Sequence, residues 1–479
     1  MWSRGPTTPC SSTRTCRRSR ARCGGSWATR SEDTDDMGEA PADGRPRGLW
    51  RDADFLKFWS AESLSMFGAQ ISVLAIPLLA ATTLDATPFQ MGVVNAAQFA
   101  PYMLFTLLAG VWIDQNRRRP IMIGANFGRA VILGLIPLLT ALDVMDVGLL
   151  SVIVFLAATL TVLFDLAYQA YIPSLVGRDH LIEGNGKLEG SRSLAQASGP
   201  GLGGVLVGLV TAPAAVLINA CTYLVSAVSL LFIRRSEPAP ASTATEGSVI
   251  SRIGTGLRLV GTNPYLRAIA GEAATYNLFN QGLWAVLILY LTRELHFTPV
   301  ILGVVMAMTG IGAFLGSLVA GRLGRRWGIG PTIMGTMVIA CAAPLLIPAA
   351  GGGRVLSAVV VGLALLINGM GVVISNIQVI SLRQTAVSSE ILGRANAGYR
   401  FLVTGTAALG ALLGGWLGGL IGLRATLVVV GLGTLGALVF IARSPLPRLR
   451  DLSEVVPDDG RRGERGTGTA PVVEAGDPH

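Results

Sequence analysis

Long apolar runs alternate with short polar connectors between about residue 55 and residue 442. Each run is close to the roughly 20 residues that a helix needs to cross a bilayer. We count twelve runs, centred near residues 68, 100, 130, 158, 201, 222, 280, 310, 339, 368, 408 and 432. The pattern predicts an all-α membrane protein with twelve transmembrane helices.

The connectors between the runs differ in charge along the chain. Those after the second, fourth, eighth and tenth runs are basic, as in DQNRRRP and GRLGRRWG, whereas those after the first, third and fifth contain no Lys or Arg. Basic connectors are retained on the cytoplasmic side of a membrane. We therefore expect a multi-pass protein of the plasma membrane, with both termini and a linker at 234–265 in the cytoplasm.

The two ends of the chain lack the apolar pattern. Residues 1–48 are rich in Arg, Ser, Cys and acidic residues without periodicity, and residues 443–479 are polar as well. Such composition predicts disordered tails, because it offers too little apolar surface to bury. Met37 is an alternative start of the protein, in which case the stretch before it is not translated.

The sequence repeats itself at an offset of 211 residues. Gly110 then meets Gly321, and Pro120 meets Pro331. The same offset aligns a later segment, in which Asn185, Gly199, Gly203 and Gly204 meet Asn396, Gly410, Gly414 and Gly415. We predict two six-helix bundles, 49–233 and 266–442, with a polar site near the midplane between them and alternating access by rocking.

Composition excludes several classes of protein. Hydrophobic residues make up 51% of the chain and charged residues 14%, which is too few charges for a soluble globule. The net charge of +9 lies largely in connectors, so it predicts topology and no nucleic-acid partner. HExxH, GxSxG, GxxxxGK and CxxC patterns are absent from the sequence, so we expect neither an enzyme nor a metal or other cofactor.

The connector AGVWIDQNRRRP resembles the loop between helices two and three of the major facilitator superfamily. The residues that match are Gly110, Asp114, Arg118 and Arg119, whereas Gln115 and Arg117 depart from the pattern. The resemblance implies that Asp114 accepts hydrogen bonds from the amino end of a helix in the other half and closes the inner side. A solvated charge in a topology hairpin is the alternative. In the second copy Arg325 stands where the Asp would be.

A second stretch, GKLEGSRSLAQASGPGLGG, resembles the antiporter motif that the same family carries in helix five. The matching residues are Gly186, Gly199, Pro200, Gly203 and Gly204, with Ala195 in place of one Gly. Glycines at such spacing let helices approach closely, and Pro200 bends the helix. We expect this face to pack on the helix that carries Gly310, Gly312 and Gly316; small-residue packing common to any membrane bundle is the alternative.

Residues 50–442 as a whole resemble the drug–proton antiporter branch, which includes macrolide-efflux and enterobactin-exporter-like proteins. The resemblance implies a monomeric exporter of amphipathic small molecules that works by alternating access and proton antiport. Sodium is an alternative coupling ion. An ion-coupled nutrient symporter of the same fold is an alternative function, and a non-transporting membrane receptor or enzyme is a further one.

Ionisable residues within the apolar runs are candidates for function, because a charge in hydrocarbon is costly. They are Glu62, Arg129, Asp165 and Glu272. Arg129 and Asp165 lie at similar depth in neighbouring runs, so they are expected to form an ion pair, or Asp165 carries the coupled proton. The two Glu residues carry protons or are interfacial charges. Polar residues beside them are candidates for the substrate cavity: Gln70, Tyr276, Asn277, Asn280, Gln281 and Asn376.

Overall fold

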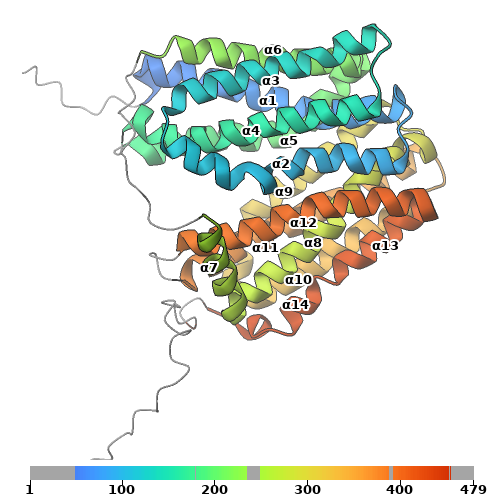
Figure 1. The fold of residues 1–479 in the computed structure, drawn as a ribbon. Coiled ribbons are helices and arrows are strands. Elements are labelled where there is room, and N and C mark those ends of the chain that lie inside the picture. Colours follow the sequence, from blue (N-terminus) through green and yellow to red (C-terminus); the bar gives the residue numbers. More distant parts are fainter. Residues whose placement is uncertain (1–48, 178–179, 235–248, 388–391, 452–453, 455–479) are drawn as a thin grey trace, which may run out of the picture. The chain divides into compact units, whose positions relative to one another are not determined.

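The computed structural model describes residues 49–177, 180–234, 249–387, 392–451 and 454. All of them belong to one unit of the chain, Arg47–His479. The described residues are almost entirely helical (Figure 1). Of the predicted disordered tails, residues 1–48 lie outside the described residues, as do 452–453 and 455–479 of the tail predicted for 443–479.

Helices of the first half follow one another with short connections. After the 3₁₀ turn Leu49–Arg51 they are α1 (Ala53–Thr82), α2 (Pro88–Asp114), α3 (Arg118–Ala141), α4 (Val147–Val176), α5 (Leu181–Leu209) and α6 (Ala212–Leu231). Within this half α1 and α3 both pack on α6, and α4 packs on α2 and α3.

The second half has more interruptions in its helices. It contains α8 (Pro264–Leu289) with the π-helical turn Tyr290–Glu294, α9 (Pro299–Trp327), α10 (Ile329–Ala342) with the 3₁₀ turn Ala343–Ala349, α11 (Arg354–Thr385), α12 (Leu392–Ile421), α13 (Leu423–Leu435) and α14 (Leu438–Ala442). Helix α12 packs on α8, and α11 packs on α9 and α10.

Nine segments of the described chain are helical, long and apolar enough to cross a membrane. They are α1, α3, α4, α6, α9, α11, most of α12, α10 with its 3₁₀ turn, and α13 with α14. Helices α2, α5 and α8 are 27, 29 and 26 residues long and pack among these nine. Charged side chains in the first half of α5 lower its hydropathy. The number of twelve spans stays a prediction.

Two Thr-Pro pairs start corresponding helices of the two halves. The Thr87 side chain accepts a hydrogen bond from the Gln90 amide at 3.3 Å, and Gln90 Oε1 accepts one from the Thr87 amide at 2.8 Å. Thr298 likewise accepts from the Ile301 amide at 3.4 Å. Pro88 and Pro299 occupy the first helical position, where no amide hydrogen is required. The local sequence therefore sets where α2 and α9 begin.

Two stretches that the sequence analysis treated as linker or tail contain ordered structure. Helix α7 (Val249–Thr262) lies within the predicted linker and packs against α12 and α8. After α14, the 3₁₀ turn Leu446–Arg448 continues into an extended segment that docks on the start of α10. There the Gly330 amide donates to Leu449 O at 2.9 Å, and the Ile329 amide donates to Arg450 O at 3.3 Å. Burial of the apolar side chains of Leu446 and Leu449 in the second half explains this docking.

Glycines form the close contacts between the two halves. In α5, a Cβ at Gly204 would lie 2.6 Å from Gly303 Cα and 2.6 Å from Pro299 O of α9. In α12, a Cβ at Gly415 would lie 2.8 Å from Gly92 Cα and 2.7 Å from Pro88 O of α2. Real side chains do not fit at these distances, so glycine is required at both crossings.

The other glycines of the predicted helix-five face have different partners. Gly199 and Gly203 pack against Gln70 and Ile71 of α1, so the expectation of one continuous face toward α9 is wrong for them. On α9, Gly310 meets Ala197 of α5, whereas Gly312 and Gly316 meet Leu366 and Met370 of α11. The helical period explains the difference, because residues one apart on a helix point about 100° away from each other.

We expect Gly204→Ala to destabilise the protein. The added methyl has no room against the backbone of α9, and overpacking of this kind costs about 1–3 kcal/mol. In detergent solution the melting temperature should fall by about 2 °C or more. Gly186→Ala on the same helix is the matched control, because a Cβ there meets nothing within 4 Å. Equal melting temperatures for the two variants would contradict the assigned contact.

Candidate transport site

Arg293 joins the two halves at one end of the bundle. Its Nη2 donates to Ala86 O at 3.0 Å and to Ala81 O at 3.5 Å, and it lies 4.0 Å from Asp85 Oδ1. The loops that follow α1, α3 and α5 lie at this end, which we call the Arg293 end. Together with the contacts Gly204–Gly303 and Gly92–Gly415, Arg293 closes the space between the halves here.

The halves are less tightly packed at the opposite end, which holds the α2–α3 loop and which we call the Arg117 end. Helices α2 and α5 meet the second half through their portions nearer the Arg293 end. A Cβ at Gly110 in α2, or at Gly186 or Gly190 in α5, meets nothing within 4 Å. Arg192 of α5 is 47% exposed. Helices α5 and α9, and α2 and α12, therefore touch backbone to backbone near the Arg293 end, while α2 and α5 have open space beside these glycines near the Arg117 end.

One cavity of about 440 Å³ lies within the second half, and we call it the C-half cavity. Five predicted residues share its wall: Glu272, Tyr276, Asn277, Asn280 and Asn376. Trp284, Thr309, Asn368, Ser375 and Tyr399 also line it. Glu272 is 5% exposed and is the one charged side chain among the lining residues. The wall therefore combines a carboxyl group, amides and aromatic rings, as a site for amphipathic ligands does.

Hydrogen bonds fix Tyr276 in this wall. The Asn368 amide Nδ2 donates to Tyr276 Oη at 3.1 Å and to Ala340 O at 2.8 Å. Tyr276 Oη in turn donates to Asn280 Oδ1 at 3.4 Å. The chain connects α8, α11 and α10, so the polar groups hold three helices around the cavity.

A second cavity, of about 390 Å³, lies within the first half, and we call it the N-half pocket. Helices α1, α2, α3, α4 and α6 contribute to its wall, and the polar side chains are Ser72, Gln98, Tyr102, Arg129, Thr161, Asn219 and Tyr223. Asn219 is oriented by donating to Ser72 Oγ at 2.7 Å. The sequence analysis did not find this pocket, because no helix carries more than a few of its residues.

Glu62 and Asp165 lie near this pocket without lining it. Glu62 is 6% exposed, and its Oε2 has no hydrogen-bond partner among the described residues. Arg129, Asp165 and Arg192 are near enough to act on it electrostatically. Asp165 accepts a hydrogen bond from Tyr102 Oη at 2.9 Å. Two buried ionisable groups, Glu62 of α1 and Arg129 of α3, and the half-buried Asp165 of α4 thus lie in one region of the first half.

The expected ion pair between Arg129 and Asp165 is wrong for this structure. The Arg129 guanidinium lies 4.4 Å from the ring centre of Phe164 and 4.1 Å from that of Tyr223, and it donates to Asn126 Oδ1. Aromatic faces attract a cation, and the attraction strengthens away from water. The rings occupy the position that the carboxylate was expected to fill, while Asp165 bonds toward α2.

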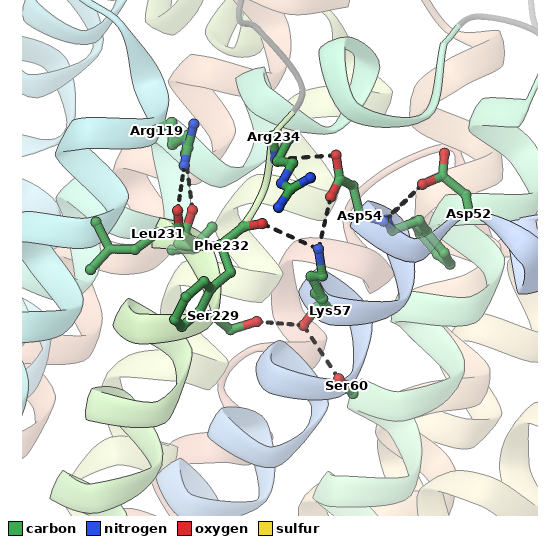
Figure 2. Close-up of polar contacts among 11 residues, drawn as sticks. Asp52, Asp54, Lys57, Ser60, Arg119, Ser229, Leu231, Phe232 and Arg234 are labelled. Atoms are coloured by element: carbon green, nitrogen blue, oxygen red, sulfur yellow. Dashed lines mark hydrogen bonds and ion pairs between the residues drawn. The ribbon is translucent and has the colours of Figure 1, made fainter.

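The described contacts of the α2–α3 loop include a cap on the end of α6. Arg119 Nε donates to Leu230 O at 2.9 Å and Nη2 donates to Leu231 O at 3.0 Å, both at the end of α6 (Figure 2). Arg119 therefore neutralises the carboxyl end of a helix in its own half. Arg118 is the first residue of α3, and Asp114 ends α2. The Asp114 side chain lies outside the described residues, so its role stays a prediction.

Lys57 of α1 supports the same helix end. Its Nζ donates to Phe232 O at 3.2 Å and to Asp54 Oδ1 at 3.2 Å, and its own carbonyl accepts from Ser229 Oγ at 2.9 Å (Figure 2). The Arg234 amide donates to Asp54 Oδ2 at 3.2 Å. Two cations thus surround the carbonyls at the end of α6, just before the chain leaves the first half.

Two other predicted cavity residues line neither cavity. Gln70 packs against Gly199 of α5, and Gln281 on α8 is half-buried outside the C-half cavity wall. Arg293, by contrast, was not a candidate. It is one of the few basic residues in the connectors that follow the odd-numbered apolar runs. A lone Arg where other connectors lack basic residues is the signal that could have found it.

The sequence profile of the transmembrane secretion effector family matches residues 49–459. The chain belongs to this family of major facilitator superfamily transporters. It is therefore a multi-pass membrane transporter of small molecules and not an enzyme.

Relatives of this chain include the multidrug efflux pump Tap. The Tap of Mycolicibacterium fortuitum is 26% identical over 402 residues, which cover 80% of this chain and 93% of that protein. The Tap of Mycobacterium tuberculosis is 28% identical over 410 residues, covering 82% and 93%.

Solved structures with the same fold include a bacterial homologue of the lysosomal transporter Spinster, in an inward-facing and occupied conformation. Its TM-score is 0.65 at 14% identity, with 85% of this chain and 97% of that chain covered. The nucleoside transporter NupG gives 0.64 at 15% identity, covering 81% and 98%. At these identities the likeness concerns the fold alone.

We expect Arg119→Ala to loosen the end of α6. Removal of the guanidinium leaves two carbonyl groups without their charged donor, and a charge-assisted hydrogen bond contributes about 1.5–3 kcal/mol before screening by solvent reduces it. Hydrogen exchange of the amides in the last turn of α6 should become at least about threefold faster. Arg117→Ala is the control, because Arg117 caps α3 without a side-chain hydrogen bond. Unchanged exchange in Arg119→Ala would refute the capping role.

Proposed function

We propose that this protein exports amphipathic small molecules from the cytoplasm by alternating access, coupled to the entry of protons. The observation that carries the proposal is the closure at the Arg293 end, beside two cavities with buried ionisable groups. A transporter that is closed at one end and open at the other represents one of the two states that alternating access requires. The family and the Tap relatives support the direction of transport.

The charge of the connectors orients the molecule. Because basic connectors remain inside, the Arg117 end and both termini face the cytoplasm, and the Arg293 end faces outward. The described conformation is then inward-facing, ready to take up cargo from the cytoplasm. Rupture of the Arg293 contacts and of the glycine crossings would have to accompany opening to the outside.

A pseudo-twofold relation between the halves supports the rocking mechanism. The contact of Gly204 with Gly303 and Pro299 corresponds to the contact of Gly415 with Gly92 and Pro88 when every residue is shifted by 211. Shifting α5 gives α12, and shifting α2 gives α9. Two equivalent crossings that form and separate together would let the two six-helix halves tilt symmetrically against each other.

The composition of the cavities supports amphipathic cargo. Tyr276, Trp284 and Tyr399 offer apolar rings next to the amides of Asn277 and Asn280 in the C-half cavity. Aromatic walls with few fixed polar groups accept ligands of varied shape. This is the pattern expected for a pump that handles several drug-like or siderophore-like molecules. The printed names of the Tap relatives agree with such a role.

Glu62 and Glu272 support coupling to protons. Each is a buried carboxyl group, Glu62 on α1 of the first half and Glu272 on α8 of the second. A carboxyl group that is exposed in turn to the two sides of the membrane can take up a proton outside and release it inside. Asp165 is a third candidate, since its hydrogen bond from Tyr102 can be exchanged for a proton.

Efflux of a radiolabelled macrolide from cells that lack their own pumps tests the proposal. Expression of the protein should lower steady-state accumulation several-fold, and a protonophore should abolish that effect. Glu272→Gln should lose at least about tenfold in efflux rate at equal membrane abundance, because the amide can no longer carry a proton. Glu294→Gln, an exposed residue near the Arg293 end, is the control and should transport normally.

Accumulation that rises on expression would indicate uptake and would exclude export. Loss of efflux with a sodium ionophore but not with a protonophore would exclude proton coupling. Full activity of Glu272→Gln together with full activity of Glu62→Gln would remove both residues from the coupling mechanism.

We expect Arg293→Ala to shift the molecule toward the outward-open state. Its hydrogen bonds to Ala81 O at the end of α1 and to Ala86 O in the α1–α2 loop exist only while the outer end is closed, so their loss lowers the cost of opening. A cysteine placed at Asn280 in a cysteine-free variant should react at least about threefold faster with an impermeant thiol reagent added outside. Arg424→Ala is the control, because Arg424 donates to Pro348 O within the second half. Equal rates in both variants would count against the outer latch.

A further inference from the structure

The two cavities carry single charges of opposite sign. Glu272 is the one charged side chain that lines the C-half cavity, and Arg129 is the one that lines the N-half pocket. The proposed proton coupling uses carboxyl groups and gives no role to a buried cation. Arg129 is 4% exposed and lies deep in α3, so the reason for burying it must be sought in the pocket itself.

The surroundings of Arg129 leave part of the hydrogen-bonding capacity of its guanidinium unused. Phe164 and Tyr223 cover it at 4.4 and 4.1 Å from their ring centres. Asn126 Oδ1 accepts from Nη2, and Asn126 is itself held by its donation to Ser226 Oγ at 2.8 Å. Nε has no hydrogen-bond partner among the described residues. A guanidinium has five N–H groups, so the Arg129 side chain keeps donors that are unsatisfied.

Nearby carboxylates do not take up these donors. Asp165 accepts from Tyr102, and neither Asp165 nor Glu62 lines the pocket. The rest of the wall consists of apolar groups from α1 and α4 with amides and hydroxyls from Gln98, Asn219 and Tyr223. Val73, which is 53% exposed, lies where the pocket reaches the surface of α1. The pocket is thus an apolar space with one fixed cation at its back and an entrance.

We propose that the N-half pocket binds the carboxylate of a compact amphipathic acid, with Arg129 as the group that holds it. A planar guanidinium pairs with a carboxylate through two parallel hydrogen bonds. The pocket volume of about 390 Å³ falls in the range of small-molecule sites and leaves room for an apolar ring system beyond the carboxylate. The inference deepens the proposed function, since it adds acids to the cargo that the exporter selects.

Equilibrium dialysis with the purified full chain in nanodiscs at pH 8 tests the site. The probes are 2-naphthoate and its uncharged match 2-naphthamide. We expect the wild type to bind the acid at least about tenfold more tightly than the amide. Arg129→Gln should abolish this preference by weakening binding of the acid while leaving the amide unchanged. Arg129→Lys should retain part of it, because the charge remains but the planar pair of donors is lost.

Two further variants protect the test. Val73→Trp places a large ring at the exposed entrance and should weaken binding of both probes without disturbing Arg129. Arg267→Gln changes an exposed arginine of α8 and should bind like the wild type. Equal affinity of the wild type for acid and amide, or a preference that survives in Arg129→Gln, overturns the proposal. If Arg129→Gln does not fold, unaltered binding by Val73→Trp overturns it.

The carboxylate can reach the pocket from solution or as a fatty acid from the bilayer. Displacement of bound 2-naphthoate by oleate supports entry from the bilayer, and lack of displacement supports entry from solution. In either case Arg129 is the group that binds the carboxylate. Because binding is measured without a gradient, loss of macrolide export with an intact acid preference removes the proposed function alone. Loss of the acid preference with intact macrolide export removes this inference alone.

Discussion

Close approach of helix backbones at glycine is the constraint on which the rest of the structure depends. Lipid offers no hydrophobic drive for helices to associate, so packing contacts and small residues must supply it. Gly204 meets Gly303, and Gly92 meets Gly415, near one end of the molecule. These crossings hold the halves together there, and Arg293 adds a polar link beside them.

The buried charges show how a membrane protein retains groups that hydrocarbon disfavours. Arg129 is covered by two aromatic rings and bonded to Asn126, and Glu272 lies in a wall of amides and ring edges. Neither is neutralised by a described ion pair. A charge that is stabilised without a permanent counter-ion remains able to exchange partners, which a transport cycle requires.

Sequence reasoning reached the helical class and the family from the apolar runs, the basic connectors and the helix-five glycines. These features depend on composition and spacing, which a single chain displays. Partners of individual side chains were harder to predict. Arg119 caps α6, a contact that the connector pattern did not suggest, and Arg129 was paired with Asp165 but lies between rings. Such choices depend on which helix faces are juxtaposed, and neither spacing nor depth along the chain specifies rotation about the helix axis.

The docked segment after α14 also bears on how related sequences should be compared. At the offset of 211, Gly330 occupies the place of Arg119. One half fastens its helix ends through a guanidinium, whereas the other lays main chain against main chain, with amides of Ile329 and Gly330 bonded to carbonyls of Arg450 and Leu449. Main-chain pairing requires no particular polar side chain, and the side chains of the docked segment that are buried beside it, Leu446 and Leu449, are apolar. Relatives can therefore keep this fastening while their last residues diverge beyond alignment, with a single small residue as its only trace.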